Sequence, residues 1–397
     1  MRIRFDYVRL FLILLLCMIP VGLFGIPGLK ILWFGALGIM LSEVMIKKYP
    51  IYTHYDNWNS FYLFLYLLMH VISTFINNGN WVYNATTLIV MVSMTLVISC
   101  EICSNPKRFL HCLEKVLILT LITEFVLYLA DAGSYFMDFA CMRLYYICWA
   151  IIYMLNHLNR KRNHFFYILS AAAAVITIIK PQIGSDGSAN YEWTFYLIIL
   201  ILCMVSISLN HGNLWKILTG KRVFIVIIFL NLYFVMFQAF MKSKLFQFII
   251  VDIMHKSGDI SGRAGIWRKA LSMVHPNILL GYGTSLAGIS STGDYWTEFV
   301  RIYGPHNQML YILLSGGLIT LMFYGWILYK VSSRLTKADG KYACIICAGI
   351  LVSYLELLVT FRNMINCIPL FILLWIGYFL PIIQNETVVK KRRSWRI

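Results

Sequence analysis

Arg263, Arg301 and His306 are the residues of this chain whose types and positions best suit chemistry. All three lie in one long, partly polar stretch, residues 242–307, which separates two apolar runs. A guanidinium group binds phosphate oxygens through paired hydrogen bonds, and an imidazole exchanges protons near neutral pH. Long stretches of this kind between packed helices are usually functional. Together these side chains predict a site that binds a phosphorylated substrate and moves a proton.

A helix over residues 262–274 is expected to position Arg263. Ser261 is a good N-cap for this helix, and Ile266 and Ala270 then share an apolar face. Free backbone N–H groups and the helix dipole favour an anion at a helix N-terminus, where a guanidinium group can grip phosphate oxygens. The alternative is that Arg263 contacts lipid headgroups at a membrane interface.

His306 and Asn307 follow a Gly-Pro pair at the start of the next apolar run, where a helix is expected to hold the imidazole near an aqueous rim. Histidine suits general acid–base chemistry. A lone histidine at a helix end is more often structural, but its place after the two arginines favours a functional role.

Glycines and aromatic residues mark the rest of the polar stretch. Gly281 and Gly283 form a Gly-x-Gly turn that permits close backbone approach, without the further residues of a nucleotide-binding fingerprint. Tyr295 and Trp296, beside acidic and hydroxyl residues, suit a surface that contacts sugars, and an interfacial aromatic belt explains them equally well. In the following apolar run, Gly316–Gly317 is expected to permit close helix packing.

The composition indicates a polytopic membrane protein. Of the 397 residues, 60% are hydrophobic and only 13% are charged, and the mean hydropathy is +0.73. A soluble domain cannot bury that much apolar surface, whereas a bilayer solvates it. The net charge of +17 is explained by lysines and arginines in cytoplasmic segments, so we expect a lipid bilayer and no nucleic acid as partner.

About twelve apolar runs are long enough to be transmembrane helices. They predict an all-α fold with a single integral membrane domain over residues 1–397. The basic residues place both termini in the cytoplasm, with residues 385–397 as a basic cytoplasmic tail and residues 242–307 as an extracytoplasmic loop. The predicted spans are 8–27, 29–46, 60–77, 85–103, 115–133, 142–158, 164–180, 193–210, 223–241, 308–329, 342–360 and 367–384.

Ten cysteines lie mostly inside or beside apolar runs. The pairs Cys100-Cys103 and Cys344-Cys347 have the CxxC spacing, but no cluster of His or Cys lies near them in sequence to complete a metal site. We therefore expect neither a metal nor a cofactor.

Three short motifs, in this order, resemble those of the O-antigen ligase and polymerase superfamily, which are membrane glycosyltransferases. The resemblance covers about 60 residues by motif and the whole chain by its layout of many spans and one long outer loop. The family's proline after the asparagine is absent, because Ile278 follows Asn277 and Pro276 precedes it. The matching residues are Ser261-Gly262-Arg263 with Trp267, Asn277 with Gly281 and Gly283, then His306-Asn307 with Leu310, Leu313 and Gly317-Leu318.

The resemblance implies a GT-C-like membrane fold and transfer of a glycan from a polyprenyl diphosphate, with inversion at the anomeric carbon and without a nucleotide sugar or metal. It assigns Arg263 to diphosphate binding and His306 to general-base catalysis or acceptor orientation. Arg301 is the second choice of phosphate ligand. Further cations from other outer loops are Lys180, Arg143 and Arg362.

Four residues, one of them Arg362 again, are candidates for contact with acceptor or sugar, or for a structural role: Asn307, Trp267, Glu356 and Arg362. Glu356 is costly in lipid and should therefore face the interior of the bundle. We favour a structural pairing of Glu356 with an arginine over a role in orienting a sugar.

The favoured function is a polymerase of a surface polysaccharide, such as O-antigen, capsule or exopolysaccharide, in the bacterial cytoplasmic membrane. Its donor and acceptor would both be undecaprenyl-diphosphate-linked glycans, joined at the outer face, and a chain-length regulator could bind it. A ligase that moves a finished glycan to another acceptor shares the same motifs. A flippase or transporter of the lipid-linked glycan is the third alternative, disfavoured because charges are sparse within the spans.

Overall fold

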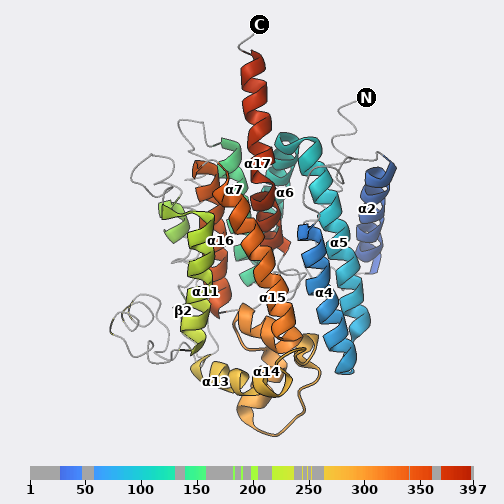
Figure 1. The fold of residues 1–397 in the computed structure, drawn as a ribbon, viewed down its shortest axis with the longest axis vertical. Helices are drawn as coiled ribbons and strands as arrows, with labels where there is room; N and C mark the ends of the chain where they lie inside the picture. The colour runs from blue at the N-terminus through green and yellow to red at the C-terminus, as the bar shows by residue number, and fades with distance from the viewer. Residues whose placement is uncertain are drawn as a thin grey trace.

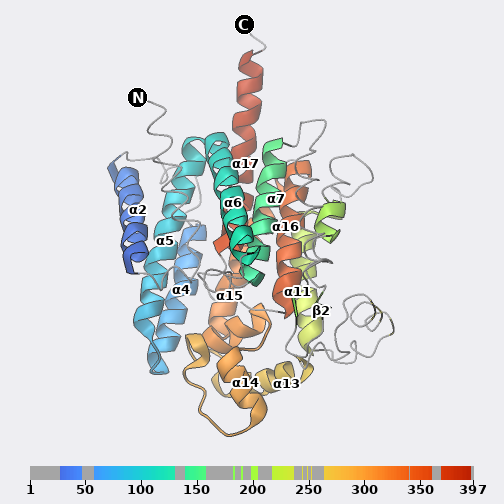
Figure 2. The ribbon, with the colours of Figure 1, turned by 180° about the vertical axis from the view of Figure 1, so that it is seen from behind.

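The computed structural model is a bundle of long helices with a cap of short helices at one end (Figure 1, Figure 2). The cap is formed by residues 263–307, and α17 projects from the opposite end of the bundle (Figure 1). The structure describes residues 27–46, 58–129, 139–157, 182–183, 189–190, 198–203, 217–236, 244, 248, 252, 263–338, 340–359 and 368–394.

Within these residues, nine long helices form the bundle, and each consists mainly of a run of apolar residues. The only helix-breaking residues inside them are glycines and Pro381. A two-residue antiparallel strand pair, β1 (Gln182–Ile183) and β2 (Ala189–Asn190), accompanies them. The bundle helices are α2 (Pro27–Ile46), α4 (Trp58–Ile76), α5 (Trp81–Ser104), α6 (Pro106–Leu129), α7 (Phe139–His157), α11 (Gly220–Met236), α15 (Gln308–Thr336), α16 (Gly340–Val359) and α17 (Ile368–Ser394).

These helices confirm the all-α fold class, and each overlaps one of the predicted spans. Among the residues that the structure describes, three helical segments are long and apolar enough to cross a membrane, Trp81–Cys103, Gln308–Thr336 and Gly340–Leu358. Shorter apolar segments are Phe61–Ile76 and Ile368–Gln384. Three predicted spans lie largely outside the described residues. They are 8–27, of which only Pro27 is described, 164–180, and 193–210, of which residues 198–203 are described. The total of twelve transmembrane helices therefore stays a prediction.

The structure describes residues 385–394 of the predicted basic tail, and its place in the cytoplasm stays a prediction. Residues 385–394 continue α17 as a helix to Ser394, because the sequence after Pro381 contains good helix formers and no glycine or proline.

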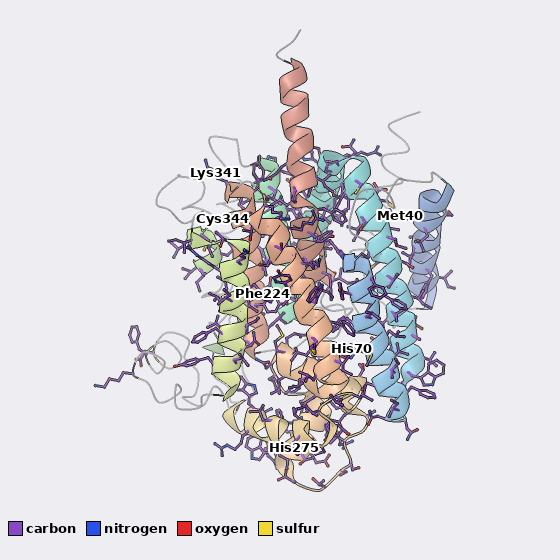
Figure 3. All side chains as sticks on the ribbon, in the orientation of Figure 1. Met40, His70, Phe224, His275, Lys341 and Cys344 are labelled. Atoms are coloured by element: carbon purple, nitrogen blue, oxygen red, sulfur yellow. The ribbon has the colours of Figure 1, made fainter. Side chains whose placement is uncertain are left out.

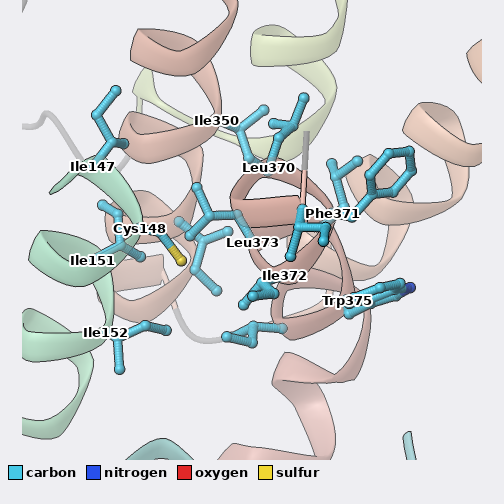
Figure 4. Close-up of a cluster of buried hydrophobic side chains, with 14 of the residues drawn as sticks. Ile147, Cys148, Ile151, Ile152, Ile350, Leu370, Phe371, Ile372, Leu373 and Trp375 are labelled. Carbon is cyan, nitrogen blue, oxygen red and sulfur yellow. The ribbon is translucent and has the colours of Figure 1, made fainter. Parts of the chain in front are cut away.

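Part of the main core lies where α7, α16 and α17 meet, and most side chains there are aliphatic, with Phe371 and Trp375 of α17 beside them (Figure 4). Ile147 and Ile151 of α7 and Ile372 and Leu373 of α17 are fully buried. Gly349 of α16 allows close packing here, since a Cβ atom at this position would collide with Ile151.

Helix α15 runs through the middle of the bundle and contacts α4, α11, α16 and α17. Its start joins the cap, which contains α13 (Arg263–Val274), α14 (Tyr295–Tyr303) and the 3-10 turns η5 (His275–Asn277) and η6 (Thr284–Leu286). His275 marks the cap end of the molecule, whereas Lys341 and Cys344 lie toward the opposite end (Figure 3).

Candidate active site

Helix α13 begins at Arg263 and ends at Val274, in close agreement with the predicted range 262–274. The side chain of Arg263 and the expected N-cap Ser261 lie outside the described residues, so their contacts stay predictions. The backbone nevertheless places Arg263 in the first helical turn, where free N–H groups favour an anion.

One face of α13 is buried in a second, smaller core under the cap. Ile266, Trp267 and Ala270 are at most 2% exposed and pack in a cluster with Leu310 and Leu358. Trp267 was predicted either to contact acceptor or sugar or to be structural, and its full burial in this cluster favours the structural alternative. Its contribution to the site is to fix the orientation of α13.

Helix α14 was not predicted, and Asp294 explains why it forms. Asp294 is its N-cap, and one carboxylate oxygen accepts hydrogen bonds from the backbone N–H (3.0 Å) and hydroxyl (2.8 Å) of Thr297. The ammonium group of Lys269 on α13 lies 3.1 Å from the same carboxylate. The Thr297 hydrogen bonds, and then Lys269, hold the pKa of Asp294 below its ordinary value. Gly304, with φ +74°, ends the helix.

Arg301, the second choice of phosphate ligand, forms an ion pair within α14. Its Nε and Nη2 atoms donate to one oxygen of Glu298 at 2.9 and 2.6 Å. The other oxygen of Glu298 accepts from the Ser291 hydroxyl at 2.6 Å. The hydrogen bond from Ser291, followed by that from Arg301, lowers the pKa of Glu298. The charge of Arg301 is thus already compensated, and a phosphate would have to compete with Glu298 for it.

His306 lies just before α15 rather than on it, in the left-handed backbone region with φ +48°. This conformation is uncommon for a residue with a side chain, and such residues often occur at functional sites. The imidazole is half-buried, and its centroid lies 5.8 Å from that of Phe299 on α14.

Asn307 explains how the strained backbone of His306 is held. Asn307 is fully buried and caps α15, because its side-chain oxygen accepts from the backbone N–H of Leu310 at 2.9 Å. Its amide nitrogen donates to the carbonyl of Leu358 at 3.0 Å and to the side chain of Asn231 at 3.3 Å. Asn307 therefore ties the start of α15 to α11 and α16, which favours the structural alternative for this residue.

The Gly-x-Gly turn lies against a break in α15, and we call residues 277–284 the glycine latch. Gly317 has φ +75° and ψ −175°, so α15 is interrupted at this residue. The sequence predicted close helix packing here but not the interruption. Backbone groups freed by the break bond to the latch: the N–H groups of Tyr282 and Gly283 donate to the carbonyls of Leu314 and Ser315 at 2.7 and 3.0 Å.

The other side of the break is bonded in the same way. The N–H of Leu318 donates to the carbonyl of Ile278 at 2.7 Å. Glycine is required on both sides, because a Cβ atom at Gly281 would lie 2.5 Å from the carbonyl oxygen of Leu314 and one at Gly317 would collide with Leu279.

Polar side chains at the end of α4 complete the latch, and sequence reasoning did not identify them. The buried Ser73 hydroxyl donates to the carbonyl of Ser315 at 2.8 Å and accepts from the N–H of Gly283 at 3.0 Å. The Thr74 hydroxyl accepts from the N–H of Thr284 at 2.8 Å, and Asn77 donates to the carbonyl of Gly281 at 3.1 Å. The available signal was the polar sequence Ser-Thr-x-x-Asn at the end of an apolar run.

Two neighbouring rings of α14 lie against the first turn of α13 and against His306. A Cβ atom at Gly265, two residues after Arg263, would lie 2.7 Å from the indole of Trp296. The centroids of Trp296 and Phe299 are 6.4 Å apart, and Phe299 contacts His306. The first turn of α13 and the histidine are thus connected through two neighbouring rings.

The remaining candidates lie elsewhere or outside the described residues. Glu356 on α16 is fully buried, as expected of a carboxylate that avoids lipid. Arg143 lies near the start of α7, and its side chain is outside the described part. Lys180 and Arg362 also lie outside it. The roles of these four residues stay predictions.

Comparison with known proteins shows that the part of the chain containing the cap resembles a described protein family. Residues 189–325, which include the cap and the first part of α15, match the family model of O-antigen ligases. One relative is a protein of Rickettsia conorii that is provisionally named a polysaccharide ligase. It is 24% identical over 259 residues, and the aligned part covers 59% of each chain. No solved structure matches this chain, so a GT-C-like fold stays a prediction. These similarities confirm the predicted resemblance to the O-antigen ligase and polymerase superfamily.

Proposed function

Because residues 189–325 match the O-antigen ligase family, we propose that this membrane protein transfers a glycan from a polyprenyl-diphosphate carrier to the hydroxyl group of an acceptor. The observation that supports this proposal is the pair of α14 ring contacts, with Trp296 against Gly265 beside Arg263 and Phe299 against His306. A short helix thereby joins an anion-binding helix start to a candidate base, the two groups that the reaction needs.

In the proposed reaction, the acceptor oxygen attacks the anomeric carbon while the bond from that carbon to the diphosphate oxygen breaks. The bonding electron pair leaves with the diphosphate, and direct attack inverts the anomeric configuration. The acceptor proton passes to the imidazole of His306 and then to solvent. Arg263 stabilises the charge that develops on the diphosphate, an effect worth about 3–4 kcal/mol at comparable oxyanion sites.

The surroundings of these two residues act by positioning them. Asn307 holds His306 through its bonds to α11 and α16. The pair of Arg301 with Glu298 stiffens α14, and we rank Arg301 below Arg263 as a phosphate ligand because binding would require it to leave or share Glu298.

We place this site at the outer face of the bacterial cytoplasmic membrane, with both termini in the cytoplasm. The cap lies at the end of the bundle opposite the projecting part of α17, which carries a run of lysines and arginines in its sequence (Figure 1). Lys341 also lies away from the cap (Figure 3). The excess of basic residues on the cytoplasmic side of membrane proteins supports this orientation.

For the acceptor, the comparisons favour a ligase that moves a finished glycan to another molecule over the polymerase suggested by the sequence. The two reactions break the same bond and differ only in which hydroxyl attacks. The lipid-linked glycan is the donor in both, and in a polymerase it is also the acceptor.

The test uses the full-length protein in nanodiscs with a synthetic undecaprenyl-diphosphate oligosaccharide and a panel of acceptors. His306→Ala should lower kcat by about 10²- to 10⁴-fold, as for loss of a general base. Arg263→Ala should lower it by about 10²- to 10³-fold, and Arg263→Lys should restore part of the rate because lysine keeps the charge without the bidentate geometry. Products are read by gel and mass spectrometry.

His275→Ala and Arg268→Ala are the matched controls, because both side chains are exposed on the same segment. Transfer to an added acceptor without a ladder would support the ligase, and a ladder of joined units would replace it with the polymerase. Wild-type rates in both site variants would disprove the assigned residues. Movement of the lipid-linked glycan across vesicle membranes without a new glycosidic bond would identify a transporter instead.

A further inference from the structure

Four aromatic side chains of α14 form a continuous row that reaches His306. Successive ring centroids are separated by 5.0 Å from Tyr295 to Trp296, by 6.4 Å to Phe299 and by 5.0 Å to Tyr303. Residues 295, 299 and 303 recur every four positions and so share one face of the helix. Tyr295 is 67% exposed and Tyr303 is 57% exposed, so both ends of the row are open to the surroundings.

The row is held in place by contacts at its back and edges. The indole of Trp296 lies against Gly265, where no side chain intervenes. The ion pair of Lys269 with Asp294 joins the start of α14 to α13. Glu298 is held by Arg301 and Ser291 on the same segment. The rings therefore form a surface that needs little ordering when a ligand binds.

A row of this kind suits sugar rings. The face of an aromatic ring carries negative charge, which attracts the weakly positive C–H groups of a pyranose. From residue 295 to 303 the helix rises about 12 Å, enough for a short run of linked sugars. Asp294, next to Tyr295 in the sequence, uses one carboxylate oxygen for Thr297 and Lys269, and its other oxygen can accept from a sugar hydroxyl group.

Insertion of these rings into the membrane interface is the competing explanation. Trp81 and Tyr83 at the start of α5, outside the cap, are 44% and 43% exposed and fit that role. The α14 row differs because it leads directly to His306. In the sequence, Asp294 directly precedes the row and Glu298 directly precedes Phe299, and ionised carboxylates are costly to bury in lipid.

We propose that the α14 row binds consecutive pyranose rings of the glycan next to the bond that reacts. This inference rests on the proposed transfer reaction for the identity of the ligand. It assigns Tyr295 and Tyr303 to stacking against sugars, and it makes α14 the element that guides the glycan to His306.

The experiment compares Tyr295→Leu, Tyr303→Leu and the double variant in full-length protein in nanodiscs. Each leucine keeps an apolar side chain but removes the ring face. Each single change should raise the KM for the lipid-linked oligosaccharide by about three- to tenfold while kcat changes by less than about twofold, since only binding is affected. The Phe variants should restore KM because they keep the ring. Tyr83→Leu, an exposed aromatic outside the row, is the matched control.

Binding is also measured without the reaction, by saturation-transfer NMR with the same oligosaccharide freed from its lipid. Ring-dependent binding would support the row even if no glycosidic bond were ever formed, which separates this inference from the proposed function. Normal transfer with unchanged KM in the double leucine variant would overturn it. Equal effects of Tyr83→Leu on KM would assign the rings to the membrane interface and also overturn it.

Discussion

The core between α7, α16 and α17 and the glycine latch at α15 are both tightly packed, but different groups make the contacts. In the core, branched side chains such as Ile151 and Ile372 fill the space between intact helices. In the latch, backbone groups from residues 277–284 and the break at Gly317 bond to one another, with Ser73 between them.

The difference shows where each region tolerates change. An aliphatic core responds to changes in volume and accepts many substitutions of similar size. A helix break whose backbone groups bond to a loop is destabilised by a single added Cβ atom or by one lost hydrogen-bond donor, because unsatisfied polar groups are costly away from water. The second kind of packing joins the cap to α4 and α15.

The largest effect is expected from Gly317→Ala. The added methyl group would collide with Leu279, and the backbone conformation at φ +75° and ψ −175° is essentially restricted to glycine. Strain and overpacking together should cost about 3–5 kcal/mol. The measurement is the temperature at which the detergent-solubilised protein loses its monodisperse elution peak, together with transfer activity.

Gly325→Ala is the control on the same helix, since nothing lies within 4 Å of the added atom. It should be neutral or stabilise α15 by about 0.5–1 kcal/mol, as expected for alanine in a helix interior. Equal behaviour of the two variants would mean that α15 is not broken at Gly317.

An intermediate effect is expected from Ser73→Ala. Loss of its hydroxyl leaves the N–H of Gly283 without this partner and removes one of two donors to the carbonyl of Ser315, at a cost of about 1–3 kcal/mol. Ile372→Val in the core should cost about 0.5–1.5 kcal/mol. At a temperature where both variants are folded, only Ser73→Ala should lower transfer activity. Equal loss of activity in the two would show that stability alone governs the site.

The smallest effect is expected from acid. The pKa values of Asp294 and Glu298 are lowered in the folded cap, so their stabilising contribution is complete above the ordinary carboxyl range and is lost as pH falls through the lowered values. Amide hydrogen exchange across residues 291–303, corrected for its intrinsic pH dependence, should increase at acidic pH. Asp294→Asn keeps a capping residue but should reduce this dependence, whereas an unchanged profile would argue against the bonds of Asp294 to Thr297 and Lys269 as its source.

Local patterns in the sequence predicted much of the fold. Helix α13 agreed within one residue, because Ile266, Ala270 and Val274 recur at helical spacing and Trp267 lies beside them. Helix α14 was missed, although Asp294 as a cap and the aromatic spacing at 295, 299 and 303 are visible in the sequence. At nine residues it is too short for a clear periodic signal.

The glycine latch could not be predicted in the same way. The bond between Ser73 and Gly283 joins residues 210 positions apart, and nothing local to either one indicates the partner. A glycine pair in an apolar run is compatible with close packing or with a break, since hydrophobic periodicity carries no information on φ. His306 was identified by its position, but its strained backbone depends on Asn307 and its bonds to distant helices.

The break in α15 also bears on the order in which the protein is made. Both partners of the break, the end of α4 and residues 277–284, precede α15 in the chain and leave the ribosome first. When α15 enters the membrane, its interrupted backbone meets partners that have already been synthesised. In the opposite order, the carbonyl and N–H groups of residues 314–319 would lie in lipid without hydrogen-bond partners until those partners were synthesised. Unpaired backbone groups in the hydrocarbon region are energetically costly.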